Sequence, residues 1–452
     1  MTAPARTSAY HALRAIAGER ADLPSALALA RRHLSDERDR ALTADIVTGT
    51  LRWQRSLDHL IEQMAKRRLV KIDPEVVLIL RLSLYQILHL DRVPASAVVD
   101  DAVDLTRGAR KPSASGFVNA VLRTTLRQRH RLPLPPRPDA PEDRAAARAY
   151  LGITLSHPDW LVARWLDRHG FEAAERWVRF NNETPRLTLR ASAPRGGRAA
   201  VAAALAADGI ETEPARHAPE GLIVTAGNPL RREPDGSFVV QDEASQLVTL
   251  AVGARPGERV LDLCASPGGK ATAMAGDMRD TGTLVACDVR PRRIALLRQT
   301  VRTSGVERVR IVHLAPSGPL PFTPVFDRVL VDAPCSGLGT IRRDPDIRWR
   351  RAEGDLARFA RDQIALLARA AELVRPGGRL VYATCSSEPD ENDAVVEAFR
   401  AGHTDFSLVD LRADGSPALA AVLDSRGMMR TLPFEHGLEA FFAAALIRRE
   451  ST

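Results

Sequence analysis

From Phe238 to the C-terminus the sequence alternates short apolar runs with amphipathic stretches, and this alternation constrains the fold more than any other feature. The apolar runs predict strands at Val260–Cys264, Leu284–Asp288, Val309–His313, Arg328–Asp332 and Arg379–Cys385. Helical patterns lie between them, notably over Arg292–Thr303 and Leu356–Val374, the second ending at the breaker cluster 376–378. Strands that alternate with helices favour a parallel, doubly wound sheet, which binds ligands at the carboxyl ends of its strands.

The N-terminal third of the sequence predicts helices throughout. They are expected over Arg38–Met64, from Asp73-Pro74 onward, over Ala97–Arg107 and after Gly116. Residues 1–130 hold 21 Lys and Arg against 14 Asp and Glu, so +7 of the net charge of +8 lies there. This excess favours a polyanionic partner, with a solvated basic surface that binds nothing as the alternative interpretation.

A proline-rich stretch separates this helical region from the rest. Leu132–Pro141 contains five prolines and forms neither helix nor central strand, so residues 131–149 are predicted to be a stiff linker. A smaller mixed segment follows, with helices expected at Asp159–Phe180 and Gly197–Ala207, a strand at Arg186–Arg190 and a turn at Pro234-Asp235-Gly236. The prediction is an all-α domain (1–130), a small α+β domain (150–235) and an α/β domain (236–452).

Composition excludes two broad classes. With 45% hydrophobic and 27% charged residues, the chain is typical of a globular protein rather than a disordered or membrane one. Its most apolar run, Val76 to Leu90, is interrupted by polar residues and is too short to span a bilayer. The N-terminal residues show no apolar targeting core, so we expect a cytoplasmic protein. The four cysteines form no CxxC pattern, and neither a metal site nor a disulfide framework is expected.

A glycine-containing loop follows the first of the predicted strands and opens a helix. Its residues are Cys264, Ala265, Ser266, Pro267, Gly268, Gly269 and Lys270. Glycines allow close approach of a ligand, and a helix N-terminus attracts a carboxylate. Asp288, at the end of the next strand, suits the two hydroxyls of a ribose. Each feature alone equally fits a tight turn or a strand-end cap, but together they favour a nucleoside-bearing cofactor.

Two further strands end in cysteines. The fourth ends in Asp332-Ala333-Pro334-Cys335, and the fifth ends in Thr384-Cys385 before Ser386. A single buried cysteine is usually an inert small side chain. Two thiols at the ends of successive strands, one of them beside a carboxylate, favour a chemical role. Cys287 and the thiol of Cys264 lack such neighbours and are expected to pack.

These blocks, together with the run Arg342–Trp349, resemble the RNA cytosine-5 methyltransferase family, whose fold is Rossmann-like. The resemblance implies S-adenosyl-L-methionine as cofactor, bound by residues 264–270, Asp288, Arg293 and Asp332. It implies that Cys385 attacks carbon 6 of cytosine, that Cys335 promotes release of the adduct, that Asp332 contacts the base, and that Lys270 assists. Covalent attack makes chemical sense because carbon 5 of cytosine is too weak a nucleophile alone, and the target base must leave its stack.

The sequence departs from the family pattern at two places. Ala315 stands where the family usually has an acidic residue near the adenine of the cofactor, which suggests weaker cofactor binding or substitution by Ser317. The stretch from Gly437 to Phe442 also differs, with an expected effect on the packing of the last strands.

The helical N-terminal third resembles the NusB-like RNA-binding domain, through Asp91–Pro94, Ala97–Leu105 and Gly116–Arg123. Its fusion to the catalytic region is similar to the type-B family of bacterial 16S rRNA (cytosine-5) methyltransferases. The resemblance implies an RNA partner, namely cytosine 967 of 16S rRNA, with residues 150–235 as a second RNA-binding domain in a monomer. Two alternatives stay open: a tRNA cytosine-5 methyltransferase, or a catalytically silent RNA-binding or antitermination factor. A dehydrogenase is disfavoured because no G-x-G-x-x-G is present.

Overall fold

The structure is a computed structural model and describes residues 2–450. These residues form two compact units: one reaches to Glu183 and also includes Ile341–Arg351, and the other comprises Thr184–Thr340 and the residues from Ala352 onward. The helices of the first unit are α1 (Pro4–Ala17), α2 (Leu23–Arg32), α3 (Glu37–Arg52), α4 (Gln54–Ala65), α5 (Pro74–His89), α6 (Ala95–Gly108), α7 (Ser115–Gln128), α8 (Arg144–Ala149), α9 (Asp159–Asn182) and α14 (Ile347–Arg350).

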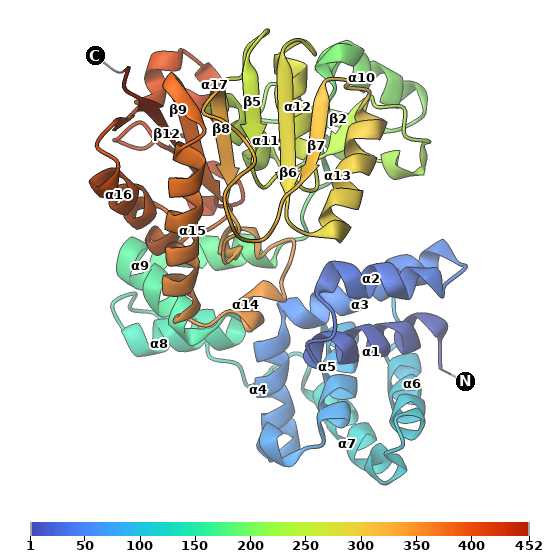
Figure 1. Ribbon diagram of the computed structural model, residues 1–452. Coiled ribbons are helices and arrows are strands. Elements are labelled where there is room, and N and C mark those ends of the chain that lie inside the picture. The colour runs from blue at the N-terminus through green and yellow to red at the C-terminus, as the bar shows by residue number, and fades with distance from the viewer. Residues whose placement is uncertain (1, 451–452) are drawn as a thin grey trace. The chain divides into compact units, whose positions relative to one another are not determined.

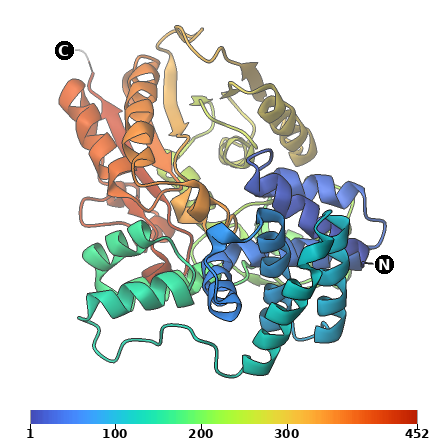
Figure 2. The ribbon, with the colours of Figure 1, turned by 90° about the horizontal axis from the view of Figure 1, so that it is seen from below.

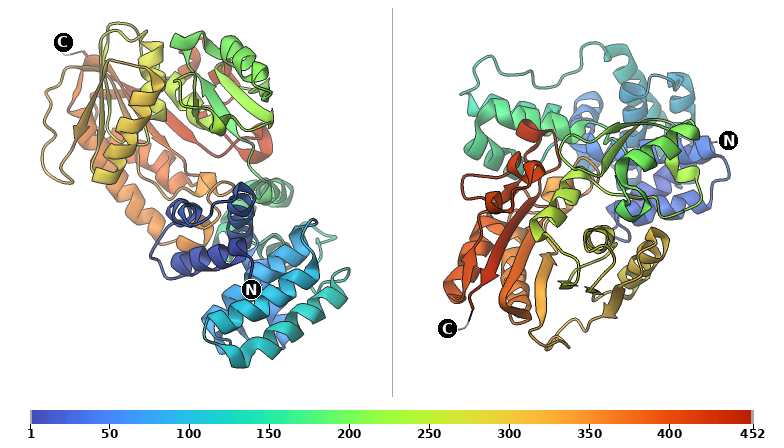
Figure 3. Two further views of the ribbon diagram at one scale, coloured as in Figure 1. Left: turned by 90° about the vertical axis from the view of Figure 1, so that its right-hand side faces the viewer. Right: turned by 90° about the horizontal axis from the view of Figure 1, so that it is seen from above.

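The first unit is helical, as the sequence predicts. Helix α5 lies at the centre of its core, where Ile79 and Leu80 are fully buried, and α1, α3, α4, α6 and α7 pack against it. Figure 3 shows these N-terminal helices in blue and cyan. Asp73 caps α5, its carboxylate accepting a hydrogen bond from the backbone N–H of Glu75 at 3.0 Å. Residues 131–143 have neither helix nor strand and run as an extended chain (Figure 2), as their prolines predict.

Two expected helices prove to be interrupted. The single helix predicted over Arg38–Met64 is wrong, because α3 ends at Arg52 and α4 begins at Gln54. Trp53 leaves helical geometry between them and stacks on the His89 ring of α5, with 4.7 Å between ring centroids. Helix α9 bends at Gly170, whose φ of 74° and ψ of 176° suit only glycine. In both cases the chain changes direction, and the helical segments on either side of the break each bury residues in the unit.

The segment Ile341–Arg351, which we call the strap, folds within the first unit although it follows the Cys335 loop in sequence. Arg348 is fully buried and donates to the carbonyls of Arg52, Ser156 and Asn181 and to Oδ1 of Asn182. Trp349 donates from Nε1 to the carbonyl of Leu51 at 2.6 Å. The strap is therefore an integral part of the helical core.

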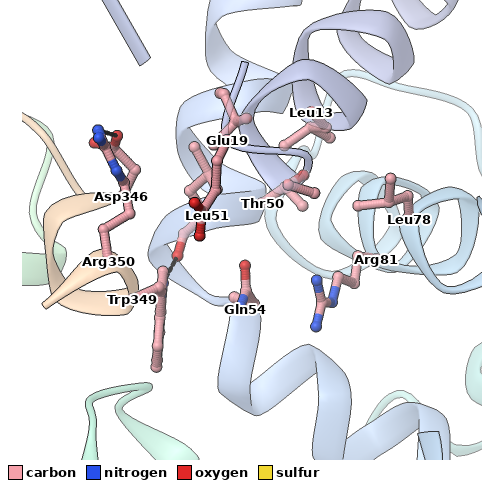
Figure 4. A pocket seen from close by; sticks show the side chains of 12 residues that line it. Leu13, Glu19, Thr50, Leu51, Gln54, Leu78, Arg81, Asp346, Trp349 and Arg350 are labelled. Carbon is pink, nitrogen blue, oxygen red and sulfur yellow. Dashed lines mark hydrogen bonds and ion pairs between the residues drawn. The ribbon is translucent and has the colours of Figure 1, made fainter. Parts of the chain in front are cut away.

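Strap residues also line a cavity of about 330 Å³ in this unit. Figure 4 shows Trp349 and Arg350 of the strap on one side of the cavity, with Arg81 of α5 on the other. None of the residues expected to bind a cofactor or to act on a substrate lines it.

The second unit holds two sheets. The smaller is antiparallel, in the order β2-β3-β1-β4, and its strands are β1 (Thr188–Ala191), β2 (Glu211–Pro214), β3 (Gly221–Ala226) and β4 (Phe238–Val240), with α10 (Gly197–Ala207) packed on it. The larger sheet follows the order β10-β12-β9-β8-β5-β6-β7, with β11 paired to β12. Its strands are β5 (Arg259–Asp262), β6 (Thr283–Asp288), β7 (Val309–His313), β8 (Phe326–Asp332), β9 (Val374–Thr384), β10 (Phe406–Leu408), β11 (Met429–Arg430) and β12 (Phe442–Arg448).

The large sheet is parallel from β9 through β8, β5 and β6 to β7 (Figure 1). The helices of this unit, besides α10, are α11 (Glu243–Val252), α12 (Gly269–Asp277), α13 (Pro291–Ser304), α15 (Asp355–Ala371), α16 (Asp393–Gly402), α17 (Pro417–Ala420) and α18 (Pro433–His436). The predicted fold class, with an all-α part, a small α+β part and a Rossmann-like α/β part, is confirmed. The sheet is nevertheless mixed rather than purely parallel, because β12 returns antiparallel to β9 and β10.

Two strand boundaries differ from the sequence prediction. Strand β5 ends at Asp262, two residues early, because the chain then turns into the glycine loop. Strand β9 begins at Val374, ahead of the expected breaker cluster. Val374 pairs with Phe326, but the next partners are Arg379 and Arg328. The residues between them bulge from the ladder, and Gly377 there has a φ of +72°. The prolyl-glycine cluster thus distorts the strand instead of preceding it.

Candidate active site

The two cysteines expected to carry the chemistry lie together at the carboxyl edge of the sheet. Strands β8 and β9 are parallel neighbours in which Asp332 pairs with Ala383, so the loops that follow them emerge side by side. The sulfurs of Cys335 and Cys385 are 3.3 Å apart, and both side chains are half-buried free thiols. The hydrogen bond to Cys385, together with burial, raises the pKa of the Cys335 thiol well above its ordinary value.

A lysine and an aspartate form an ion pair beside the thiols. Lys270 Nζ, on the first turn of α12, lies 2.8 Å from Asp332 Oδ2 at the end of β8. Burial lowers the pKa of Lys270, but the charge of Asp332 and its hydrogen bond more than offset this, so the pKa is raised. Lys270 is therefore an ammonium, which also lies 5.6 Å from the centre of the Phe441 ring.

The glycine loop is held by backbone contacts to its neighbours. The N–H of Ala265 donates to the carbonyl of Cys287 at 2.8 Å, and Ser266 Oγ donates to the carbonyl of Arg293 at 3.0 Å. The peptide between Ser266 and Pro267 is cis. Gly268 has a φ of +111°, and a Cβ there would lie 3.0 Å from Leu297, so only glycine fits.

The small antiparallel sheet also supports this loop. Arg190 of β1 is buried and donates to the carbonyl of Gly269 at 3.1 Å and to Thr272 Oγ1 at 2.8 Å. Its Nε donates to Gln241 at 2.7 Å. Burial lowers the pKa of Arg190 to about 10. The sequence does not indicate this role of Arg190, because a single arginine in a short strand gives no signal of where its side chain reaches.

The remaining expected cofactor residues lie at the next strand and helix. Asp288, at the end of β6, is buried, and its Oδ1 accepts from the N–H of Arg290 at 3.0 Å. Arg293 on α13 has its guanidinium 3.8 Å from Asp288 Oδ2 and is 46% exposed, so this ion pair is weak. The thiol of Cys264 packs against the core of the unit, and burial and the charge of Asp262 raise its pKa. Ala315 and Ser317 are exposed beyond the end of β7.

Asp262, which the sequence analysis missed, is the most unusual group of the site. It ends β5 fully buried, and neither of its carboxylate oxygens has a hydrogen-bond partner among residues 2–450. Burial and the charge of Asp332, only partly offset by Lys270, raise the pKa of Asp262 to about 8. The sequence feature that could have pointed to Asp262 is an acidic residue within the apolar run Val260–Leu263. Unpartnered buried acceptors suit a cationic ligand, and S-adenosyl-L-methionine, with its sulfonium and ammonium groups, fits them.

A second missed residue, Glu391, lies behind the two thiols. It belongs to the short helical turn η7 (Pro389–Glu391) and is fully buried. Its carboxylate accepts hydrogen bonds from Ser336 and Ser386, the residues that directly follow the two cysteines. Nothing in the sequence spacing indicates this, because Glu391 follows the end of β9 in an irregular stretch.

Neither a membrane-spanning helix nor a cluster of metal-binding side chains is found among the described residues. Over residues 2–450 no helix is long and apolar enough to cross a membrane. Within the same range no three His, Cys, Asp or Glu side chains are grouped so that they could hold a metal ion.

Three family models match successive parts of the chain. They are the NusB family over residues 3–127, the ferredoxin-like domain of RsmF/B-like methyltransferases over 157–231, and the 16S rRNA methyltransferase RsmB/F family over 249–447. Among solved structures, that of PH0851 covers 100% of this chain and 99% of its own with 26% identity and a TM-score of 0.79. A methyltransferase homologue from Pyrococcus horikoshii covers 67% of this chain and 99% of its own, with 28% identity and a TM-score of 0.57.

The fold and the glycine loop beside Asp262 therefore define an S-adenosyl-L-methionine-dependent methyltransferase. Among curated relatives, the probable ribosomal RNA small subunit methyltransferase B of Bacillus subtilis is 34% identical over 92% of both chains. The ribosomal RNA small subunit methyltransferase B of Pseudomonas putida is 33% identical over 98% of both. The chain belongs to this family, the ribosomal RNA small subunit methyltransferases B.

Proposed function

We propose that this protein methylates carbon 5 of a cytosine in 16S rRNA, of the cytosine-967 type, through a covalent bond between Cys385 and carbon 6. The observation that carries the chemistry is the pair of sulfurs 3.3 Å apart, beside the Lys270–Asp332 ion pair. The names of the relatives from Bacillus subtilis and Pseudomonas putida support ribosomal RNA as the substrate. The basic N-terminal third suits an RNA partner, and we place the reaction in the cytoplasm.

In the first step the Cys385 thiolate adds to carbon 6 of the extruded cytosine, and the electron pair of the C5–C6 double bond becomes available at carbon 5. The cofactor, held by residues 264–270, Asp288, Arg293 and Asp332, would supply the methyl group for carbon 5, and its sulfonium would leave as a neutral thioether. Asp332 accepts a hydrogen bond from the N4 amino group of the base. Lys270 holds one oxygen of Asp332 in place, and this fixes the orientation of its carboxylate.

In the second step the thiolate of Cys335 takes the proton from carbon 5. The electron pair of that C–H bond re-forms the C5–C6 double bond, the bond from carbon 6 to sulfur breaks, and Cys385 leaves as a thiolate. The hydrogen bond to Cys385, the largest cause of the raised pKa of Cys335 in the free protein, is lost once Cys385 is bonded to carbon 6. Burial and the charge of Glu391 still raise the pKa of Cys335 and make its thiolate a stronger base for this proton. Cys385 thereby attacks the base, and Cys335, in contact with it, promotes release of the adduct.

The two cysteines are tested separately with a 16S rRNA transcript and S-adenosyl-L-methionine. Cys385→Ser should abolish methyl transfer, at least 1,000-fold, because an alcohol is a far weaker nucleophile at neutral pH. Cys335→Ala should instead accumulate a protein–RNA adduct that survives a denaturing gel. The double variant, which should form no adduct, is the control. Normal turnover by Cys385→Ser would refute the covalent mechanism.

The substrate is tested by bisulfite sequencing of rRNA and tRNA from a deletion strain. Loss of one 5-methylcytosine in 16S rRNA supports the proposal. Loss of a tRNA site would favour a tRNA cytosine-5 methyltransferase instead. If no methylated cytosine were lost, a silent RNA-binding or antitermination factor would be favoured over an enzyme.

A further inference from the structure

We propose that Glu391 is a positioning residue that fixes the distance between the Cys335 and Cys385 thiols by clasping the loops that carry them. We call Glu391 and its three donor residues, Ser336, Ser386 and Gln363, the clasp. Its consequence for catalysis rests on the proposed function, whereas the spacing of the thiols does not.

The contacts of the Glu391 carboxylate reach both cysteine loops. Oε1 accepts from the N–H of Ser336 at 2.8 Å and from Gln363 Nε2 at 3.0 Å. Oε2 accepts from Ser336 Oγ at 2.5 Å and from Ser386 Oγ at 2.6 Å. Four hydrogen bonds from three residues therefore meet on one carboxylate, and two of those residues directly follow the thiols in sequence.

Further contacts anchor the clasp to the sheet and to α15. Gln363 of α15 also donates to the carbonyl of Pro334, directly before Cys335, at 3.0 Å. The carbonyl of Glu391 accepts from Tyr382 of β9 at 2.6 Å, so the residue is fixed to the strand that leads to Cys385. The N–H of Gly339 donates to the carbonyl of Cys385 at 2.9 Å and joins the two loops a second time.

The physical reason for the clasp is the cost of a buried charge. Glu391, Ser336, Ser386 and Gln363 are each at most 1% exposed, and every hydrogen-bond partner of the carboxylate is a neutral donor. A buried carboxylate without a cation is tolerated only when donors satisfy it, and such bonds are stronger than neutral ones. The carboxylate therefore draws both serines inward, which sets where Cys335 and Cys385 lie.

The negative charge also acts on the thiol itself. The pKa of Cys335 is raised first by its hydrogen bond to Cys385 and by burial, and the charge of Glu391 adds to the shift. In the proposed reaction the clasp would hold the Cys335 sulfur close to carbon 5 of the adduct that Cys385 forms. Because Glu391 is fully buried and bonded to the residues that follow both thiols, its effect passes through the two loops.

The thiol spacing is tested on the full-length protein without RNA or cofactor. Diamide, a diazene oxidant, accepts two electrons and two protons from a pair of thiols and leaves a disulfide. The rate of the Cys335–Cys385 disulfide, followed by alkylation and peptide mass spectrometry, reports how often the sulfurs meet. Glu391→Ala should slow it at least tenfold, and Glu391→Gln, which keeps the shape but removes the charge, about threefold.

A matched control separates the clasp from general loss of stability. Glu243 is also a buried carboxylate of the same unit, but it accepts from the N–H groups of His217 and Ala218, neither of which is next to a thiol in sequence. Glu243→Gln should leave the disulfide rate within twofold of the wild-type rate. If Glu391→Ala does not fold, Ser386→Ala removes one donor and should slow the rate about threefold. A wild-type rate in Glu391→Ala, or in Ser386→Ala in its place, would overturn the proposal.

The catalytic consequence has its own readout. With RNA and cofactor, Glu391→Gln should lower kcat about tenfold, leave the KM for S-adenosyl-L-methionine within twofold, and raise the fraction of RNA held as covalent adduct. A merely structural role would lower activity in proportion to the folded fraction and leave the adduct fraction unchanged. If Cys385→Ser retained turnover, the proposed function would fail while the disulfide rates still decided the clasp.

Discussion

Two buried charges of opposite sign organise the two units of this protein. In the helical unit Arg348 of the strap is fully buried, and in the methyltransferase unit Glu391 is fully buried. The hydrogen-bond partners of both groups within residues 2–450 are neutral. Carbonyl and amide oxygens and the His157 ring surround Arg348, and amide and hydroxyl donors surround Glu391.

The difference lies in what each charge holds. Most acceptors of Arg348 are main-chain carbonyls. They join the strap to the end of α3, to Ser156 just before α9 and to Asn181 near the end of α9. The donors of Glu391 include side chains adjacent to the thiols. Similar burial therefore serves two ends: Arg348 completes the packing of a unit, whereas Glu391, in our proposal, positions the two thiols.

The largest expected effect comes from removing the buried cation. Arg348→Ala leaves several buried carbonyls without a donor and should lower the free energy of unfolding of the helical unit by about 3–5 kcal/mol. Urea unfolding followed by circular dichroism measures it. Arg350→Ala is the control, since that guanidinium is 45% exposed and its pair with Asp346 contributes about 1 kcal/mol or less. Equal losses in the two variants would contradict the role given to Arg348.

Removing the buried anion sharpens the comparison. Glu391→Gln keeps the volume of the side chain but weakens its bonds to four donor groups on three residues, so a loss of about 2–3 kcal/mol is expected in the methyltransferase unit. The free energy of unfolding in urea is the measurement. A variant as stable as the wild type would show that the clasp needs only an amide. Glu243→Gln serves again as the matched carboxylate.

Asp262 is a buried acid of the methyltransferase unit whose carboxylate oxygens have no hydrogen-bond partner within residues 2–450. Its pKa of about 8 lies above the ordinary value near 4, so the folded state keeps a proton that the unfolded chain releases between these values. The free energy of unfolding should therefore fall as the pH rises from 5 to 8, by on the order of 2 kcal/mol. Asp262→Asn should remove that slope in thermal melts recorded at a series of pH values. An identical slope in the variant would assign it to other groups.

The smallest expected effect tests a single neutral bond of the strap. Trp349→Phe removes the donor that lies 2.6 Å from the carbonyl of Leu51 but keeps an aromatic ring. The helical unit should lose about 1 kcal/mol, well below the loss in Arg348→Ala. Differential scanning calorimetry of the two variants gives the ratio. A loss as large as that of Arg348→Ala would mean that the ring, and not the buried charge, holds the strap.

Local patterns predicted much of the fold because they report on the backbone near them. The cap Asp73-Pro74 marked the start of α5, and the five apolar runs marked the central strands of the sheet. The break at Trp53 escaped prediction because it depends on the His89 ring, 36 residues later in sequence. The bulge in β9 escaped for the same reason, since it depends on the register with β8.

The fold class, the glycine loop after β5 and the cysteines that follow β8 and β9 could be read from the sequence alone, because each of these follows from residues adjacent in the chain. The 3.3 Å between the cysteine sulfurs, the unpartnered Asp262 and the clasp on Glu391 were decided only by the tertiary structure. So was the place of the strap, whose Arg348 binds carbonyls more than 160 residues away in sequence. The physical reason is burial: a charge removed from water takes whichever partners the packed chain brings within hydrogen-bonding distance, and spacing along the sequence does not record them.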